Sequence, residues 1–277
     1  MLAVALLAVS AMGFQIANAQ SLSPSTKWHW DKGTIVIDTP ERPAGQEHVL
    51  GLTAAPIKTV RVGFVGLGMR GPSAVIRFCQ IPGVKIVALC DYEEKRAEAQ
   101  QVHLRNAGLA PAAIYHGEKG YEELCKRPDV DLIYIATDWN HHFPVAKCAM
   151  ENGKHVAIEV PSAMNLEQCW NLIDLSEKTR IHCFILENCC YDDYEMKSLL
   201  MAQDGVFGEV IRAEGAYIHE LSEFWKHYWK DPNDNDKDNL HWRMKYSRSW
   251  PCGTMHEYSS WRPVHYLNCH GYRKLRR

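Results

Sequence analysis

The feature that most limits the possible folds of this chain is a glycine-rich turn that directly follows a buried apolar run. The run is Val60–Val65, and the turn reads Gly66-Leu67-Gly68-Met69-Arg70-Gly71. An apolar run bounded by glycines is typical of a strand buried on both faces of a parallel sheet. A G-x-G-x-x-G turn between a strand and a helix lets the backbone approach a pyrophosphate, whose charge then faces free N–H groups at the helix start. The sequence therefore predicts a dinucleotide site here.

The alternation of apolar runs with polar, helix-forming stretches continues after this turn. Further apolar runs occur at 85–89, 132–136, 155–158 and 183–186, and polar stretches such as 93–105 separate them. This alternation predicts an α/β fold, a doubly wound parallel-sheet (Rossmann) domain, over residues 58–187. Beyond it we expect a helix over 191–203, a turn at Asp204-Gly205 and a strand over 209–218. These elements predict an incomplete α+β substrate domain over residues 188–244.

The composition is that of a folded chain with no affinity for polyanions. The 277 residues are 46% hydrophobic, which is enough for a large core and about two domains. Because 31 Lys and Arg face 33 Asp and Glu, we expect no basic surface for nucleic acid. The ten cysteines follow no metal-ligand or disulfide spacing, so we expect small core residues and no metal site. The segment 231–238 is expected to be a solvated loop, with a calcium site as the alternative.

The N-terminal residues resemble a secretory signal. Their apolar stretch is too short to span a bilayer and is followed by the small-residue run Ala17-Asn18-Ala19. We expect a signal peptide over residues 1–19 and an exported protein, in a bacterial periplasm, although no Lys or Arg precedes the stretch; a buried N-terminal helix is the alternative. Residues 20–57 are rich in Ser, Thr, Pro and Gly, and we expect an extended arm with a β-like patch at 34–37. No second apolar run reaches the roughly twenty residues needed to cross a membrane.

Polar side chains follow several of the predicted strands. Asp91 ends the second strand, where a carboxylate accepts hydrogen bonds from both ribose hydroxyls and repels a 2′-phosphate, which favours NAD over NADP. The neighbouring Lys95 and Arg96 are expected to face solvent. Residues 137–142 follow a later strand, at the carboxyl edge where open α/β sheets bind ligands, although either histidine, His141 above all, is also interpretable as a surface residue at a helix start. Glu159 ends the next strand and is placed beside the nicotinamide.

These motifs together resemble the Gfo/Idh/MocA family of oxidoreductases. The resemblance rests on the glycine turn, Asp91, the strand start Gly153-Lys154-His155-Val156 and the strand end Glu159-Val160-Pro161. Ordinary dehydrogenases of this family carry Glu-Lys-Pro at that strand end, where the lysine assists proton transfer from the substrate hydroxyl. Val160 neither donates nor accepts a proton. The usual sugar-alcohol dehydrogenase mechanism therefore loses its main acid/base group.

One branch, the NAD-dependent α-N-acetylgalactosaminidases of glycoside hydrolase family 109, resembles the chain more closely. The likeness runs from about Thr39 to Met244 and includes residues 39–40, 44–50, 66–71, 136–139, 159–161, 186–188 and 213–219. Besides Gly66, Gly68 and Gly71, the resemblance implies NAD contacts from Met69, Arg70, Asp91, Trp139, Asn140, His141, His142, Glu159, Val160 and Asn188. It implies contacts of Tyr217 and Arg243 with a carbohydrate that ends in N-acetylgalactosamine.

The chemistry implied by this branch is redox-neutral. Oxidation at C3 of the sugar acidifies the C2 proton, a base removes it, the C1 substituent leaves, water adds, and the ketone is reduced again. This route avoids an oxocarbenium-like transition state, so it needs no carboxylate pair. Tyr217 and His219 lie two apart on a predicted strand and so share a face, which makes them candidate acid or base groups, with Glu159 as a further candidate. A sugar dehydrogenase with a different base and an inactive NAD-binding remnant remain as alternatives.

The resemblance ends after Met244. The branch normally continues with a Tyr-Pro-Thr-His stretch that contacts the substrate, and then with a long remainder of the second domain. Here residues 245–277 hold seven Lys or Arg and one acidic residue, Glu257, with no clear period. We therefore expect residues 245–277 to be a tail that is not native to the fold.

Overall fold

The structure, a computed structural model, describes residues 28–32, 34–37, 42, 44–188, 190–212 and 242. The chain divides into two compact units, and the boundary between them falls between Glu187 and Asn188. Each unit is described by itself. The expected signal peptide, the loop 231–238 and the tail 245–277 lie outside the described residues.

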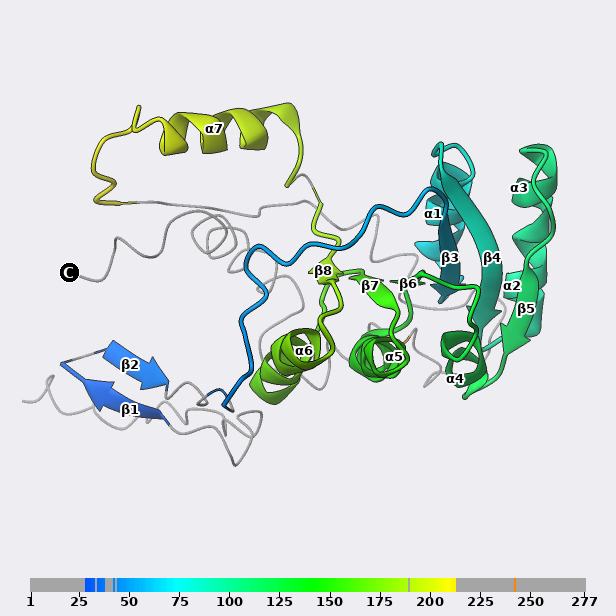
Figure 1. Cartoon of the computed structure of the whole chain (residues 1–277), viewed down its shortest axis with the longest axis horizontal. Helices are drawn as coiled ribbons and strands as arrows, with labels where there is room; N and C mark the ends of the chain where they lie inside the picture. Colours follow the sequence, from blue (N-terminus) through cyan, green and yellow to red (C-terminus); the bar gives the residue numbers. More distant parts are fainter. Residues whose placement is uncertain are drawn as a thin grey trace, which may run out of the picture. The chain divides into compact units, whose positions relative to one another are not determined.

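The larger unit is built on a parallel sheet of six strands in the order β5-β4-β3-β6-β7-β8 (Figure 1). The chain moves outward from β3 to β5, returns to the centre at β6 and moves outward again to β8. The reversal lies between β3 and β6, and such switch points are where open α/β sheets bind ligands. The predicted Rossmann architecture is confirmed. The strands are β3 Val60–Val65, β4 Val84–Asp91, β5 Ala113–His116, β6 Leu132–Ile135, β7 His155–Ile158 and β8 Cys183–Ile185.

The apolar runs located five of these strands, and the strand they missed is β5. It is a short strand at the edge of the sheet, its residues are half-buried or exposed, and its apolar residues end at the polar His116. The helical stretch predicted over 93–105 is divided into two short helices that meet at Gln100, α2 Glu94–Ala99 and α3 Gln101–Asn106.

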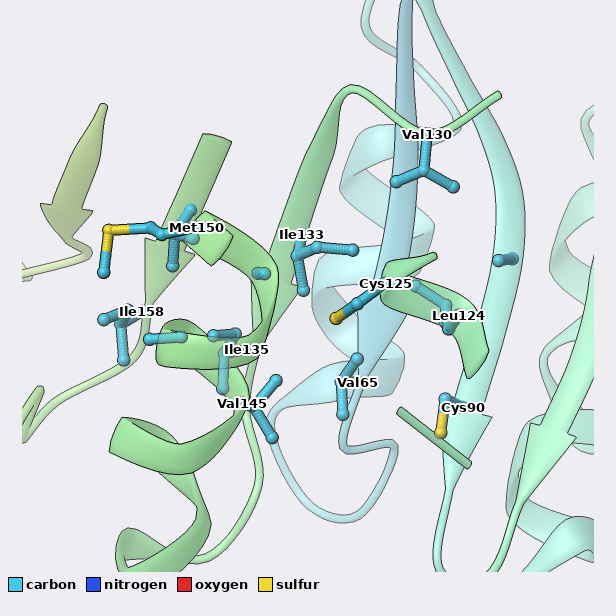
Figure 2. Close-up of a cluster of buried hydrophobic side chains, with 14 of the residues drawn as sticks. Val65, Cys90, Leu124, Cys125, Val130, Ile133, Ile135, Val145, Met150 and Ile158 are labelled. Carbon is cyan, nitrogen blue, oxygen red and sulfur yellow. The ribbon is translucent and has the colours of Figure 1, made fainter. Parts of the chain in front are cut away.

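Helices cover both faces of the sheet, and each face has its own core. Figure 1 shows α4, α5 and α6 side by side along one face, and Figure 2 shows Val145 and Met150 of α5 among side chains of the strands. On the other face α1, α2 and α3 pack against a second cluster that contains Phe64 and Tyr134. Each such apolar side chain contributes about 1.5–3 kcal/mol when fully buried. The remaining helices of this unit are α1 Gly71–Phe78, α4 Gly120–Cys125, α5 Trp139–Glu151 and α6 Leu166–Thr179.

The arm before the sheet is tied to α6. Arg42 donates through Nε to both carboxylate oxygens of Glu177, at 3.0 and 2.9 Å, and Gln46 donates to the same carboxylate at 2.8 Å. The hydrogen bond from Arg42 holds the pKa of Glu177 below its ordinary value, although burial acts in the opposite direction. Arg180 donates to the backbone carbonyl of Glu47 at 3.0 Å. The arm is therefore docked on α6 by polar contacts.

Three elements remain outside the sheet and its helices. The strands β1 Trp28–Asp31 and β2 Thr34–Ile37 pair antiparallel, so the β-like patch in the arm is a strand. Helix α7 Asp193–Gln203 belongs to the smaller unit and ends at a turn in which Gly205 has φ 74°, as the sequence predicts. Residues 209–212 do not form the beginning of the strand predicted over 209–218, and the rest of that segment is outside the described residues.

The cysteines in the described part of the chain are free thiols, among them the buried Cys90 and Cys125. Burial raises the pKa of the Cys90 thiol to about 12, so this side chain is an inert core residue. Within the same residues, no group of His, Cys, Asp and Glu side chains is arranged to hold a metal ion. No helix among them combines the length and the apolar character that crossing a bilayer requires.

Candidate cofactor site

The segments that carry the predicted site residues share one edge of the sheet. In the strand register Val65 is paired with Cys90 on one side and with Ile135 on the other, and Ile135 is paired with Ile158. These four residues are at or near the carboxyl ends of β3, β4, β6 and β7. The glycine turn, Asp91, residues 137–142 and Glu159 therefore begin side by side at the carboxyl edge.

The three glycines of the turn are needed for different physical reasons. Gly66 has φ 94°, and a Cβ there would lie 2.4 Å from the carbonyl carbon of Ala136, so only glycine fits. A Cβ on Gly71 would lie 2.2 Å from the carbonyl oxygen of Gly66. At Gly68, by contrast, a Cβ would meet only Arg96 Nη1, at 3.8 Å, among the described residues. The fold itself does not require glycine at position 68, whereas close approach of a pyrophosphate does.

The start of α1 offers hydrogen-bond donors next to this turn. The helix begins at Gly71, and its N-cap residue Arg70 makes no side-chain hydrogen bond to the first turn. The first N–H groups of a helix have no partner within the helix, and the helix dipole places partial positive charge there. Arg70 and Met69 are exposed on the same turn. This end of the helix is suited to the charge of a pyrophosphate.

Asp91 is buried at the carboxyl edge of the sheet, and its carboxylate also holds the glycine turn through a hydrogen bond. One oxygen accepts the backbone N–H of Leu67 at 2.7 Å, and the other accepts the N–H of Glu93 at 3.0 Å. Arg96 lies with Nη1 3.7 Å from Asp91 and forms a 2.8 Å ion pair with Glu93. Arg96 is exposed, as predicted, and its guanidinium nevertheless lies within ion-pair distance of both carboxylates.

The residues at the start of α5 have distinct environments. Asp138 caps the helix by accepting the N–H of Asn140 at 2.9 Å, and its other oxygen is 2.6 Å from His141 Nδ1. His141 and Asn140 are exposed, as the surface interpretation of His141 predicts. Trp139 is buried, with 5% of its surface exposed. Adjacent residues of one motif thus lie partly outside and partly inside the fold.

His142 is buried between two loops of the carboxyl edge. Its Nδ1 is 2.6 Å from the carbonyl oxygen of Pro161, and its Nε2 is 3.1 Å from the carbonyl oxygen of Thr137. Only 1% of its surface is exposed, and this burial lowers the pKa of His142 below the ordinary value. A neutral imidazole carries one N–H and donates to only one of these two carbonyl groups, so the ring lies between the loop after β6 and the loop after β7 and is bonded to one of them at a time, an arrangement that the sequence pattern did not reveal.

Glu159 has a partner that sequence reasoning missed. The hydroxyl of Tyr134 donates to Glu159 Oε1 at 2.7 Å. Tyr134 lies within β6 and reads from the sequence as an ordinary core residue of an apolar run, so only its position one residue before the strand end hinted at the edge. Val160 follows Glu159 and is half-buried.

Other predicted residues cannot be placed in this edge. Tyr217, His219 and Arg243 lie outside the described residues. Asn188 is described and exposed, and it belongs to the smaller unit.

The comparison with protein families agrees with this geometry. Residues 60–186 match the family model described as an oxidoreductase family with an NAD-binding Rossmann fold. This domain belongs to the Gfo/Idh/MocA family. The matched residues run from the first residue of β3 to the residue after β8, so they contain every part of the edge described above.

Several curated proteins that resemble this chain are named as glycosyl hydrolases. The chain is 77% identical over 242 residues to glycosyl hydrolase family 109 protein 3 of Phocaeicola vulgatus, covering 87% of this chain and 44% of that protein. It is 55% identical over 215 residues to family 109 protein 1 of Bacteroides thetaiotaomicron, covering 77% of this chain and 44% of that protein. The chain thus spans less than half the length of these two relatives.

Solved structures of similar fold include dehydrogenases. One is myo-inositol dehydrogenase from Lactobacillus casei in complex with NAD(H) and myo-inositol, with 23% identity and a TM-score of 0.48 over 54% of this chain and 43% of that chain. Another is a probable dehydrogenase from Thermotoga maritima, with 24% identity and a TM-score of 0.47 over 54% of this chain and 42% of that chain.

The residues of the Gfo/Idh/MocA domain fit the NAD that this family binds. The open space at Gly68 and the start of α1 suit the pyrophosphate, and the carboxylate of Asp91 suits a ribose with two free hydroxyls. The cofactor is NAD.

Proposed function

We propose that this protein is a glycosidase of the family 109 type, which releases terminal α-N-acetylgalactosamine by a redox-neutral, NAD-dependent route. The observation that carries the proposal is the 77% identity over 242 residues to a protein named glycosyl hydrolase family 109 protein 3. A second observation supports it: the residue after Glu159 is the aliphatic Val160, where a dehydrogenase of the Gfo/Idh/MocA family carries its proton-transferring lysine.

Bound NAD supplies a hydride acceptor for C3 of the sugar and returns the hydride at the end of the cycle. The task left to the chain is proton transfer at C2 of the sugar and at the leaving oxygen on C1. The side chain of Val160 has no group that can donate or accept these protons. We assign these proton transfers to Tyr217 or His219, and we assign to Tyr217 and Arg243 the binding of the sugar.

Glu159 is better suited to the cofactor half of this site than to the role of a free base. One of its carboxylate oxygens already accepts the hydrogen bond of Tyr134 at 2.7 Å. A general base must reach the proton it removes with a free lone pair and must be able to move toward it. A carboxylate that is held by a buried phenol is instead a fixed negative charge beside the nicotinamide ring.

An aryl α-N-acetylgalactosaminide in deuterated water tests the proposal. We expect release of the aryl alcohol with no net formation of NADH, together with deuterium at C2 of the released sugar, because the C2 proton is removed and replaced in each cycle. A glycosidase that uses two carboxylates would leave C2 unlabelled. Hydrolysis without deuterium at C2 would therefore contradict the route.

A sugar dehydrogenase is the second candidate, because the family model is that of an oxidoreductase family. It predicts NADH in equal amount to a ketone formed from a free monosaccharide, with no release of the aryl alcohol. An NAD-binding remnant, the third candidate, predicts bound NAD and neither product. Parallel incubations with the aryl glycoside and with free N-acetylgalactosamine, each followed for aryl alcohol and for NADH, separate all three.

We also propose that the protein is exported, since the apolar N-terminal stretch and Ala17-Asn18-Ala19 are typical of a signal peptide. The mass of the protein recovered from the periplasm of an expressing cell tests this proposal. We expect a chain that begins at Gln20, and a full-length chain in the cytoplasm would contradict it.

A further inference from the structure

The two halves of the bound NAD can be assigned to the two sides of β3. The pyrophosphate belongs at the glycine turn after β3, and the adenosine ribose belongs at Asp91, after the neighbouring β4. The nicotinamide half must then extend to the opposite side, over the ends of β6 and β7. Glu159 is the first residue after β7 and therefore lies on the nicotinamide side.

Tyr134 is held rigidly beneath Glu159. Only 3% of its surface is exposed, and its ring stacks on Phe64 with centroids 5.0 Å apart and an interplanar angle of 29°. Phe78 meets the same ring edge-on at 5.4 Å. Aromatic packing of this kind restricts the ring to one position. The hydroxyl is therefore a donor at a fixed point of the edge.

The direction of the hydrogen bond follows from the surroundings of Tyr134. Burial, the negative charge of Glu159 and the hydrogen bond itself raise the pKa of Tyr134 far above its ordinary value. The phenol keeps its proton at any pH the protein meets, so Tyr134 donates and Glu159 accepts. A carboxylate accepts most strongly in its ionised form.

The second oxygen of Glu159 remains available at the edge. Within the described part of the chain it has no hydrogen bond, and it is not among the buried polar atoms that lack a partner. The positive charges of Arg77 and Arg70 act on the Tyr134 hydroxyl and lower its pKa, but less than burial and Glu159 raise it. Both arginines are exposed, so water and salt screen them, whereas the half-buried carboxylate is screened less.

We propose that Tyr134 is a positioning residue that fixes the carboxylate of Glu159 beside the nicotinamide, and that the pair makes the protein bind oxidised NAD more tightly than reduced NAD. The oxidised ring carries a positive charge and the reduced ring is neutral, so a fixed negative charge favours the oxidised form. The inference rests on the NAD site and deepens the proposed function, because a cofactor that is never consumed must return to its oxidised form.

The test compares dissociation constants of the full chain for oxidised and reduced NAD, measured without sugar. Glu159→Gln keeps an acceptor oxygen for Tyr134 and removes only the charge, so we expect the preference for oxidised NAD to fall about tenfold, mainly through weaker binding of the oxidised form. Tyr134→Phe removes only the hydroxyl, and we expect a loss of about threefold. In the double variant the preference should equal that of Glu159→Gln alone, since Tyr134 acts through Glu159.

Tyr115→Phe is the matched control. Tyr115 lies on β5, and its hydroxyl accepts a hydrogen bond from Arg127 at 3.1 Å, so the variant loses a phenol bond of the same sheet away from β6 and β7. Its preference should equal that of the wild type.

An unchanged preference in Glu159→Gln would overturn the inference, and an unchanged preference in Tyr134→Phe would reduce Tyr134 to a packing residue. If Tyr134→Phe fails to fold, Glu159→Asp makes the same test, because it keeps the charge but withdraws it from the phenol. If Glu159→Asp then kept the wild-type preference for oxidised NAD, this result would contradict the positioning of the carboxylate by Tyr134. Since no sugar is present, these results are independent of the hydrolysis assay, and failure of one leaves the other standing.

Discussion

At the carboxyl edge of the sheet, the adenosine side and the nicotinamide side of the cofactor site are held by different kinds of contact. On the adenosine side, the shape is set by backbone: Gly66 is packed against another loop, and Asp91 holds the glycine turn through a main-chain N–H. On the nicotinamide side, it is set by buried side chains, in the pairs Tyr134–Glu159 and His142–Pro161. A Cβ added at Gly66 would meet backbone atoms that cannot move aside, whereas side-chain hydrogen bonds can be weakened one at a time. A substitution at Gly66 should therefore act in an all-or-none way, whereas substitutions on the nicotinamide side should act by degrees.

The largest effect should come from Gly66→Ala. The new Cβ would lie 2.4 Å from the Ala136 carbonyl carbon, at φ 94°, and neither the backbone nor the conformation can give way. We expect the free energy of unfolding to fall by about 3 kcal/mol or more, with NAD binding lost as a consequence. Chemical denaturation of the purified variant measures this. A variant as stable as the wild type would show that the two loops are not in contact.

Gly68→Ala should weaken the binding of NAD without changing the stability of the fold. A Cβ at this position would meet little protein, so stability should stay within about 0.5 kcal/mol of the wild type. The methyl group would stand where the pyrophosphate must approach, and we expect NAD to bind about 100-fold more weakly. Calorimetric titration with NAD gives the affinity.

Gly117→Ala is the control for Gly68→Ala, since Gly117 has φ 80° and open space around a Cβ. That variant should lose about 1 kcal/mol of stability through backbone strain and keep its affinity for NAD. If Gly68→Ala lowered the free energy of unfolding but left the affinity for NAD unchanged, the assigned role of Gly68 would be wrong.

Asp91→Asn should change the preference between NAD and NADP by about tenfold, a smaller effect than that of the glycines. Removing the carboxylate charge weakens the repulsion of a 2′-phosphate, and Arg96, 3.7 Å from that carboxylate, then keeps only its ion pair with Glu93 and can attract the phosphate more strongly. NAD itself should bind several-fold more weakly, because an asparagine cannot accept both backbone N–H groups with oxygen. Titration with each cofactor measures the ratio. If NADP bound no better relative to NAD, Asp91 would not be the selecting residue.

The sequence predicted the adenosine side better than the nicotinamide side, and the reason is physical. Gly66 and Asp91 have a local signature, a glycine turn after an apolar run and an acidic residue at the end of the next run, because main-chain sterics leave few alternatives. Tyr134 carries no such signature: a tyrosine in a strand is usually core, and only the register that places β6 beside β7 brings its hydroxyl to Glu159. The same holds for β5, a short edge strand whose residues are half-buried or exposed.

Histidines 141 and 142 show the limit of reasoning from a motif. They are adjacent and look equivalent in the sequence, but the helix turns them about 100° apart, so one is exposed and the other is buried. Which of the two points inward depends on where α5 begins, and helix boundaries are the part of a prediction that pattern reasoning fixes least. Arg96 is a similar case, since its ion pair with Asp91 depends on the path of the chain between β4 and α2.

The smallest predicted effect is a dependence of stability on pH that originates on the nicotinamide side. Burial lowers the pKa of His142 in the folded protein below its value in the unfolded chain. As the pH falls through about 6.5, the unfolded chain takes up the proton first, so the contribution of His142 to stability is complete above that pH and is lost as the pH falls toward the folded pKa. The slope from this one residue is at most about 1.4 kcal/mol per pH unit.

His142→Asn should reduce that slope, because its amide stays neutral and can still donate to one of the two carbonyl groups. Denaturant unfolding at several pH values between 7.5 and 5.5, a range chosen to cover about one unit on each side of the ordinary histidine pKa, measures it. His155 is the control: burial and the neighbouring His182 also lower its pKa, so His155→Asn should reduce the slope too, but His155 lies at the opposite end of β7 from Glu159. The affinity for NAD should therefore change in His142→Asn and not in His155→Asn. If both variants kept NAD affinity and His142→Asn kept the wild-type slope, His142 would be neither a titrating group nor a link between the two loops, and the nicotinamide side would depend on Tyr134 and Glu159 alone.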